Sequence, residues 1–322
     1  MNQADFQTLL PVIVLTVWAL ALLLVDLFVS KEKKWITALL AAVGLALTMG
    51  LSLSQTGQTS LGFSGMVVLD GFSTFVSILL LFSGLMGISI AYGYLKRMDI
   101  ERGEYYSLIL FSIVGMMLMA QAADLIVVFI ALELLSIPLY VLAAFASTNA
   151  SSEESGIKYF LLGAFSGSFV VYGIALVFGA TGTTAIAGIA AAASAGAANV
   201  PLMLAGSGLI LVGFGFKVAA VPFQMWTPDV YQGAPTSVTA FMAAGAKIAG
   251  FAALMRVFST AFPSIAADLT PVLAVLAALT MIVGNVAAIA QKNIKRMLAY
   301  SSIAHAGYIL MAFVAFGNPE VA

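Results

Sequence analysis

The sequence predicts an all-α polytopic membrane protein with about ten transmembrane helices. Hydrophobic residues make up 62% of the 322 positions and charged residues only 8%, and the mean hydropathy is +1.09. Soluble globular domains carry about 25% charged residues, so this composition indicates a chain surrounded by lipid. Apolar runs of about 20 residues recur, which is the length a helix needs to cross a hydrocarbon core of about 30 Å.

Ten apolar stretches fit that length. The expected helices cover residues 8–29, 36–54, 72–94, 106–121, 124–146, 156–178, 203–225, 236–258, 271–290 and 297–316. The first begins close to Met1, with no positively charged segment or small-residue cleavage motif before it. We therefore expect a retained first span rather than a signal peptide.

The basic residues orient these helices across the membrane. Nine of the thirteen lie in the first, third and ninth connecting loops: Lys31, Lys33, Lys34, Lys96, Arg97, Arg102, Lys292, Lys295 and Arg296. Cytoplasmic loops collect lysine and arginine, so we expect the odd-numbered loops inside and the N-terminus outside.

Two stretches between the expected helices are predicted to stay outside the membrane. Residues 179–202 are apolar by count but consist mainly of alanine, glycine, serine and threonine. If they crossed the membrane, the basic ninth loop would change sides, so we expect an external linker or an interfacial helix. Residues 55–71 contain short β-like runs between glycines and are predicted to form an external hairpin.

The ionisable residues Glu133, Lys158, Lys217 and Lys247 lie within the expected spans. A charge at the bilayer centre costs about 2.5 kcal/mol or more, so such residues are candidates for ion or proton pathways. A change in the separation of opposite charges can switch their protonation. Structural alternatives stay open: a Glu133–Lys217 ion pair that only holds helices together, and snorkelling to the interface by Lys247 or, more easily, Lys158.

Prolines follow two of these residues by five positions. Pro138 follows Glu133, and Pro222 follows Lys217. A proline inside a helix removes one hydrogen bond and frees a carbonyl, which membranes tolerate only within protein or beside water. We therefore expect local helix breaks beside both ionisable groups, as at the ion sites of transporters.

Other polar residues have competing interpretations. His305 lies midway along the last expected helix and is either a proton relay or a hydrogen-bonded packing residue. Asp26, near the inner end of the first helix, is expected to be paired or solvated, and Asp229 is expected to be a loop or cap residue. The 322 residues include one histidine and no cysteine, so they cannot provide bis-histidine haem ligation or a thiolate-held iron–sulfur cluster. The net charge of −1 indicates no nucleic-acid surface.

The stretch GFGFKVAAVPFQMWTPDVYQGAPTSVTAFMAAGAKIAGF at 213–251 resembles the antiporter-like membrane subunits of bacterial proton-translocating NADH:quinone oxidoreductase, respiratory complex I. Three further matches extend the resemblance over essentially the whole chain: ELLSIPLYVLAAF, EESGIKYFLLGAFSGSFVVYGIAL and QKNIKRMLAYSSIAHAGYILMAF. The resemblance implies that Glu133 is the glutamate of helix five and Lys217 the central lysine of helix seven. Lys158 and Lys247 then match the connecting lysines of helices six and eight.

The resemblance also implies fourteen helices, with an antiporter-like inverted repeat that relates spans four to eight to spans nine to thirteen and has a broken helix seven. Residues 1–105 would be the N-terminal helices one to three, 106–258 the first repeat and 271–322 the start of the second. Because the chain ends at Ala322, just after the tenth span, we expect part of a longer subunit, with the second repeat cut short.

The implied function is proton translocation across the bacterial inner membrane, driven by redox chemistry in other subunits. NADH, FMN, iron–sulfur clusters and quinone are then expected on partner subunits and none of them on this chain. Sister antiporter-like subunits and lipid are the expected neighbours. Two alternatives remain: a subunit of a cation/proton antiporter or membrane-bound hydrogenase, and a purely structural membrane scaffold.

Overall fold

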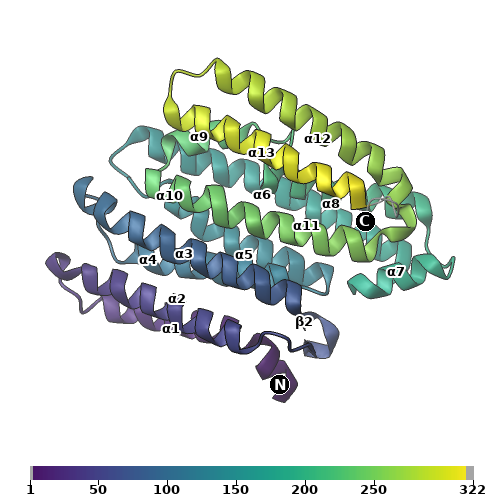
Figure 1. Cartoon of the computed structure of the whole chain (residues 1–322), viewed down its shortest axis with the longest axis horizontal. Coiled ribbons are helices and arrows are strands. Elements are labelled where there is room, and N and C mark those ends of the chain that lie inside the picture. Colours follow the sequence, from purple (N-terminus) through teal and green to yellow (C-terminus); the bar gives the residue numbers. More distant parts are fainter. Residues whose placement is uncertain (1–2, 317–322) are drawn as a thin grey trace. The chain divides into compact units, whose positions relative to one another are not determined.

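The computed structural model describes residues 3–316, which form mainly long helices (Figure 1). Within these residues, ten spans are long and apolar enough to cross a membrane, which confirms the predicted number. The helices that make up these spans are α1 (Gln3–Asp26), α2 (Trp35–Ser54), α3 (Gly71–Arg97), α4 (Glu104–Gln121), α5 (Leu125–Ala143), α6 (Ala150–Thr181), α8 (Val200–Val218), α10 (Thr236–Phe241) with α11 (Lys247–Ala261), α12 (Ala266–Ile289) and α13 (Ile294–Phe316). The chain is therefore a multi-pass membrane protein.

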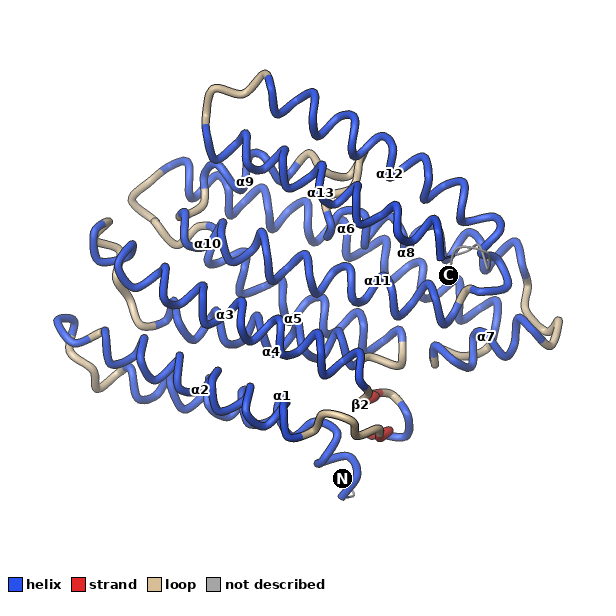
Figure 2. The backbone as a smooth tube through the Cα atoms, viewed as in Figure 1, coloured by secondary structure: helices blue, strands red, loops and turns tan. Residues whose placement is uncertain are grey.

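Short elements connect these spans, and two of them were predicted (Figure 2). The shorter helical elements are η1 (Lys31–Lys33), η2 (Phe63–Gly65), α7 (Ile186–Ser194), α9 (Trp226–Gly233), the π-helix η3 (Met242–Ala246) and η4 (Pro263–Ile265). The nine-residue α7 lies inside the stretch 179–202 and is too short to cross the membrane. A helix in this stretch was one of the two predicted forms.

The predicted hairpin is also present. Strands β1 (Ser60–Gly62) and β2 (Val67–Leu69) pair in antiparallel fashion, with Ser60 opposite Leu69. The hairpin is held to α1 by a 2.8 Å hydrogen bond between the Thr8 and Ser60 hydroxyls and by the Phe63 N–H, which donates to Asp5 at 2.6 Å. These bonds satisfy polar groups at the end of the helix.

One compact unit contains residues 3–123, 130–157 and 233–249. Helices α1 to α4 pack together in it, and a buried cluster ties the α1–α2 connection to α4. Asp26 accepts hydrogen bonds from Lys34 at 2.8 Å and from Thr37 at 2.6 Å. Its carboxylate also lies against Gly103, immediately before α4, where the positive end of the helix dipole favours an anion. Of the two expected forms, paired or solvated, Asp26 adopts the paired one.

The other compact unit contains residues 124–129, 158–232 and 250–316. A short loop joins α12 and α13, which pack side by side (Figure 1). Helices α6 and α8 approach each other through two glycines. A Cβ on Gly173 would lie 2.7 Å from the Gly206 carbonyl oxygen, and a Cβ on Gly206 would lie 2.8 Å from the Gly173 carbonyl oxygen. Small residues of this kind let membrane helices pack backbone to backbone.

Two helix ends differ from the predictions in ways that affect the candidate site. Helix α6 begins at Ala150 rather than at 156, so Lys158 lies well inside it. Helix α8 ends at Val218 rather than at 225. The expected division at 1–105, 106–258 and 271–322, and its inverted repeat, stay predictions.

Candidate functional site

Helix α8 stops one residue after Lys217, which corrects the expected position of this lysine in mid-helix. Ala219 adopts a left-handed conformation (φ 64°), and its N–H and that of Ala220 bond back to the carbonyls of Phe216 and Gly215. This is the usual way in which a helix C-terminus satisfies its last carbonyls. The expected break in this span is present, but Pro222 lies beyond the helix end and therefore does not interrupt the helix from inside.

The segment after the break is held by a hydrogen bond to α12 within the second unit. The Val221 N–H donates to the Thr280 hydroxyl of α12 at 2.9 Å, and the Val221–Pro222 peptide bond is cis. The backbone between α8 and α9 thus has a defined path although it is not helical. Irregular backbone at membrane depth requires such partners.

Lys217 is 4% exposed and lies in the last turn of α8. Its Nζ donates to the Tyr159 hydroxyl at 3.4 Å and lies 5.6 Å from the centre of the Tyr159 ring. A cation is favoured at a helix C-terminus by the dipole and over an aromatic face by its quadrupole. The helix break thus creates a buried position that accommodates an ammonium group.

An aromatic stack supports Tyr159. Its ring lies parallel to that of Trp226 at 4.6 Å, and Trp226 stacks in turn on Phe216 at 5.2 Å. The Trp226 indole N–H donates to the Phe216 carbonyl at 2.9 Å, which uses one carbonyl at the end of α8. The first turn of α9 is therefore fixed against both α6 and α8.

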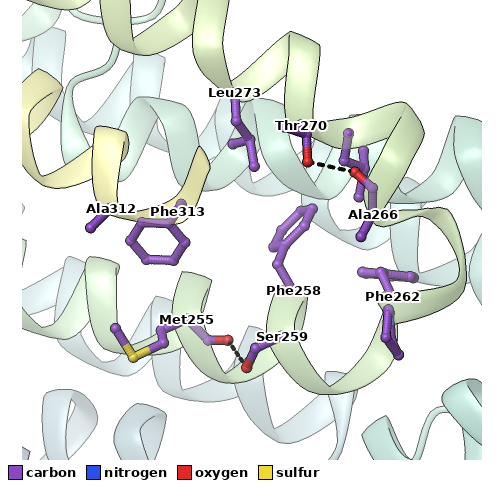
Figure 3. A pocket seen from close by; sticks show the side chains of 11 residues that line it. Met255, Phe258, Ser259, Phe262, Ala266, Thr270, Leu273, Ala312 and Phe313 are labelled. Atoms are coloured by element: carbon purple, nitrogen blue, oxygen red, sulfur yellow. Dashed lines mark hydrogen bonds between the residues drawn. The ribbon is translucent and has the colours of Figure 1, made fainter. Parts of the chain in front are cut away.

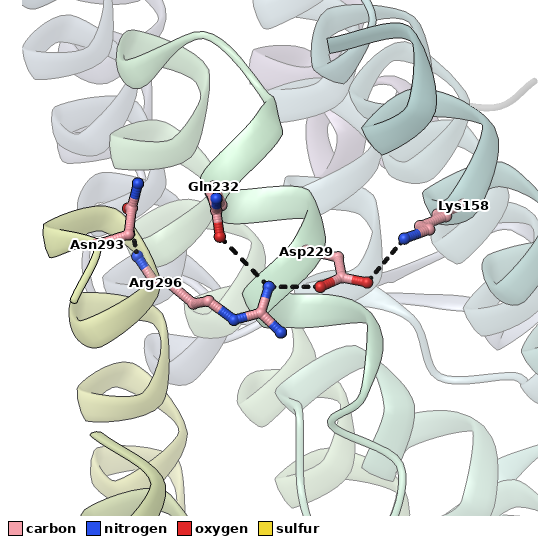
Figure 4. A network of polar contacts seen from close by, with 5 residues as sticks. All are labelled: Lys158, Asp229, Gln232, Asn293 and Arg296. Carbon is pink, nitrogen blue, oxygen red and sulfur yellow. Dashed lines mark hydrogen bonds and ion pairs between the residues drawn. The ribbon is translucent and has the colours of Figure 1, made fainter. Parts of the chain in front are cut away.

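A polar network joins α6, α9 and α13 (Figure 4). Asp229 of α9 forms ion pairs with Lys158 of α6 at 2.9 Å and with Arg296 of α13 at 2.5 Å. Arg296 also contacts the Gln232 side-chain oxygen at 3.3 Å. Asp229 was expected in a loop or at a cap. It lies in the first turn of α9, where an acid complements the helix dipole, and it pairs with two cationic side chains.

The pH dependence of this network follows from the state of Asp229. Burial raises its pKa, but hydrogen bonds from Lys158 and Arg296 outweigh burial and hold the pKa of the carboxyl below its ordinary value. A lowered folded-state pKa contributes stability above the unfolded pKa of about 3.9, and this contribution is lost as the pH falls through the folded value.

We therefore expect Asp229→Asn to lower the melting temperature of the detergent-solubilised protein by a constant amount above about pH 5 and by less below about pH 4. The side chain is 34% exposed, so solvent screening keeps the difference small. Asp268→Asn, at an exposed acid in the first turn of α12, is the matched control. A difference in melting temperature between Asp229→Asn and the wild type that does not change with pH would contradict a lowered pKa of Asp229.

In the first unit, Lys247 follows directly on a π-helix. Residues Met242–Ala246 form the π-helix between α10 and α11, and Lys247 begins α11 near the middle of the span Thr236–Ala261. Its side chain is buried, with the residue 8% exposed. Insertions of this kind in helices are frequent at functional sites, because they loosen the regular hydrogen bonding. The predicted central position of Lys247 is confirmed, and its proton-carrying role stays a prediction.

Glu133 lies near the middle of α5, as predicted, but the helix continues through Pro138 to Ala143, so the helix break expected beside Glu133 is absent. The spacing of Glu133, Ser136 and Tyr140 places them on one face of the helix. Ser136 and Tyr140 are buried, and the Ser136 hydroxyl donates to the Leu132 carbonyl. Because Glu133 belongs to the first unit and Lys217 to the second, their pairing stays a prediction.

His305 lies on an exposed face of α13 within residues 3–316. Its Nδ1 is 2.8 Å from the Ser301 carbonyl one turn earlier, and its ring contacts that of Tyr308 edge to face. The relay role stays a prediction.

A cavity of about 300 Å³ in the second unit has a different chemistry (Figure 3). Its lining is mainly apolar, with Phe258, Phe262 and Phe313 among the side chains, and contains no charged residue. Its two hydroxyl groups, of Ser259 and Thr270, donate to carbonyls of their own helices. The cavity offers no group that could take up a proton.

Sequence reasoning missed four members of the site: Tyr159, Trp226, Asp229 and Arg296. Asp229 follows Trp226 by three residues, so a short helix at WTPD would place both on one face. Arg296 was interpreted only as a marker of membrane orientation. Its partner lies 67 residues earlier, and no local pattern connects the two.

The comparisons with known proteins concern the family and the fold of the chain. The transmembrane family described as NADH:quinone oxidoreductase/Mrp antiporter matches residues 122–321. A subunit N of NADH-quinone oxidoreductase from Trichlorobacter lovleyi is 50% identical over 310 residues, which are 96% of this chain and 64% of that protein. The chain thus spans slightly less than two thirds of this relative.

Two solved structures share the fold. A chain of respiratory complex I from Thermus thermophilus, with bound aureothin, superposes with a TM-score of 0.81 at 40% identity over 96% of this chain and 65% of its own. A chain of the Mrp complex from a Dietzia species superposes with a TM-score of 0.82 at 20% identity, over 98% of this chain and 59% of its own, which shows the fold alone. The segment PFQMWTPDVYQGAPTSVTAF predicts the subunit N branch rather than the sister subunits L and M, and the name of the T. lovleyi relative confirms this resemblance. The chain belongs to the NADH:quinone oxidoreductase/Mrp antiporter transmembrane family.

Proposed function

We propose that this chain is a proton-translocating membrane subunit of an NADH:quinone oxidoreductase. The observation that carries the proposal is Lys217, which is 4% exposed at the end of a broken transmembrane helix and contacts Tyr159. Burying an ammonium group at membrane depth costs free energy, so such a group is a candidate for a function, and proton relays are a leading one. The 50% identity to a subunit N supports this function over the alternatives.

The path that we propose enters from the side of the basic loops. Lys158 pairs with Asp229, which also pairs with Arg296, and Tyr159, the next residue of α6, contacts Lys217. A proton taken up near Lys158 would continue to Lys217 and then to Lys247. Glu133 sets the proton affinity of Lys217 in this scheme, because a change in the separation of the two charges changes which protonation state is favoured.

The surroundings of the chain follow from the same proposal. The membrane is the bacterial inner membrane, with the N-terminus on the periplasmic side, because the odd-numbered loops carry the basic residues. Partner subunits, including sister antiporter-like subunits, surround the chain together with lipid. NADH oxidation, with its flavin and iron–sulfur clusters, and quinone reduction take place on partner subunits and change the protonation of this chain through coupled charges.

A cation/proton antiporter subunit is the principal alternative. The likeness to the Mrp structure, at 20% identity, supports the shared fold and no more, whereas the complex I chain is 40% identical.

Inside-out membrane vesicles that contain the native complex distinguish the two functions. NADH is expected to acidify the vesicle lumen in the absence of sodium, and a sodium pulse without NADH is expected to leave the lumen pH unchanged. A sodium-driven pH change that depends on this chain, without any NADH-driven one, would overturn the proposal.

A further inference from the structure

The network around Asp229 contains one carboxylate and two cationic side chains (Figure 4). Each oxygen of the carboxylate pairs with a different cationic side chain. Asp229 Oδ2 lies 2.9 Å from Lys158 Nζ, and Asp229 Oδ1 lies 2.5 Å from an Arg296 guanidinium nitrogen. The two cations therefore bind at the same time, with no need to exchange places. Asp229 is also positioned firmly, because Trp226, one turn earlier on α9, is stacked on Tyr159 of α6.

The two cations differ in what they can do with a proton. A lysine can release its proton when its surroundings change, whereas an arginine guanidinium stays protonated at all accessible pH values. If Asp229 faced Lys158 alone, a proton could pass between them and leave a neutral amine beside a neutral acid. With Arg296 in place, that transfer would remove the charged partner of the guanidinium and is disfavoured.

We propose that Arg296 is a fixed counter-charge that keeps Asp229 ionised while Lys158 exchanges its proton. This inference rests on the proposed function and adds a division of roles to it. The Lys158 ammonium gives its proton to a water molecule, and the electron pair of the N–H bond stays on Nζ. Asp229 remains a carboxylate throughout. Asp229 and Arg296 are thus positioning residues, and the carboxylate does not trap the proton.

Other groups near the network do not replace this arrangement. Glu154 lies one turn before Lys158 on α6, and Gln232, which contacts Arg296, carries no charge. On α13, Tyr300 lies one turn after Arg296 and contacts its guanidinium, and Lys295 is the preceding residue. None of these groups changes in the substitutions that test the proposal, so their contribution is constant.

The test is the pH profile of NADH-driven proton pumping by the reconstituted complex with variants of this chain. Asp229→Asn removes the negative charge that favours protonated Lys158, so the alkaline limb of the profile is expected to shift by about one pH unit to lower pH. Arg296→Gln removes one of the two positive charges paired with Asp229, so Lys158 becomes the remaining cationic partner and holds its proton more firmly. The alkaline limb is therefore expected to shift to higher pH. Arg296→Lys keeps the positive charge and is expected to keep the wild-type midpoint. Lys292→Gln, at an exposed lysine in the loop between α12 and α13, is the control.

Opposite shifts support the proposal, because a purely structural network would lower the amplitude of both variants without moving the midpoint. A midpoint for Arg296→Gln that stays in place, or that moves to lower pH as in Asp229→Asn, would overturn it. Lys158→Met separates this outcome from a failure of the proposed function. If Lys158→Met pumps like the wild type, the role of Lys158 itself is wrong. If Lys158→Met is defective and Arg296→Gln leaves the midpoint unmoved, only the counter-charge role is wrong.

Discussion

Replacing Lys247 with methionine is expected to abolish proton transfer through this chain while the protein still assembles. Lys247 is 8% exposed and follows the π-helix Met242–Ala246 in the middle of its span. Methionine fills a similar volume but cannot carry a proton. Removing a group that must accept and donate protons typically costs about 10²- to 10⁴-fold in rate. The measurement is the number of protons pumped per NADH oxidised by the reconstituted complex.

The melting temperature of the same complex separates a carrier from a scaffold. A structural lysine predicts the reverse pattern, in which Lys247→Met assembles poorly and the complexes that do form pump at the wild-type ratio. Lys292→Met provides the control, because this lysine is exposed in the α12–α13 loop. An assembled Lys247→Met complex with an unchanged ratio would exclude Lys247 from the path.

Gly206→Ala is expected to destabilise the second unit and to impair pumping together with it. A Cβ at this position would lie 2.8 Å from the Gly173 carbonyl oxygen and 2.9 Å from the Val177 backbone nitrogen. Because backbone atoms cannot move aside as a side chain can, α6 and α8 must separate. Overpacking of this kind costs about 1–3 kcal/mol of unfolding free energy. The same separation pulls Lys217 of α8 away from Tyr159 of α6.

Gly208→Ala is the matched control, two residues along the same helix. A Cβ at Gly208 meets no heavy atom within 4 Å apart from the neighbouring backbone of its own helix. Alanine has the higher helix propensity by about 1 kcal/mol, so this variant is expected to be neutral or slightly more stable. Thermal unfolding in detergent measures both. Equal melting temperatures for the two variants would contradict the close α6–α8 contact.

The apolar pattern predicted the spans because their physical requirement is simple: about 20 residues without charge. It failed at the end of α8 because the sequence AAVPFQM after Val218 is as apolar as the helix before it. That end is set by the left-handed Ala219 and by the bond from Val221 to Thr280, 59 residues later in the chain. Long-range contacts of this kind have no local signature.

The candidate site likewise contains residues that the sequence predicts and residues that it does not. Lys217 and Lys247 could be found from the sequence because a charge in an apolar run is conspicuous. The surroundings that give these lysines a function could not. Tyr159 is one of ten tyrosines, and Arg296 is one of thirteen basic residues. Their importance depends on the packing of α6, α9 and α13.

The most direct test of the central claim, that buried lysines of this chain carry protons, is the proton-to-NADH ratio of the complex with Lys217→Arg. Arginine keeps the positive charge at the end of α8 and over the Tyr159 ring but does not release its proton. If Lys217 carries protons, the assembled variant is expected to pump fewer protons per NADH oxidised than the wild type. An assembled Lys217→Arg complex with the wild-type ratio would contradict the account, because a fixed charge would then be enough.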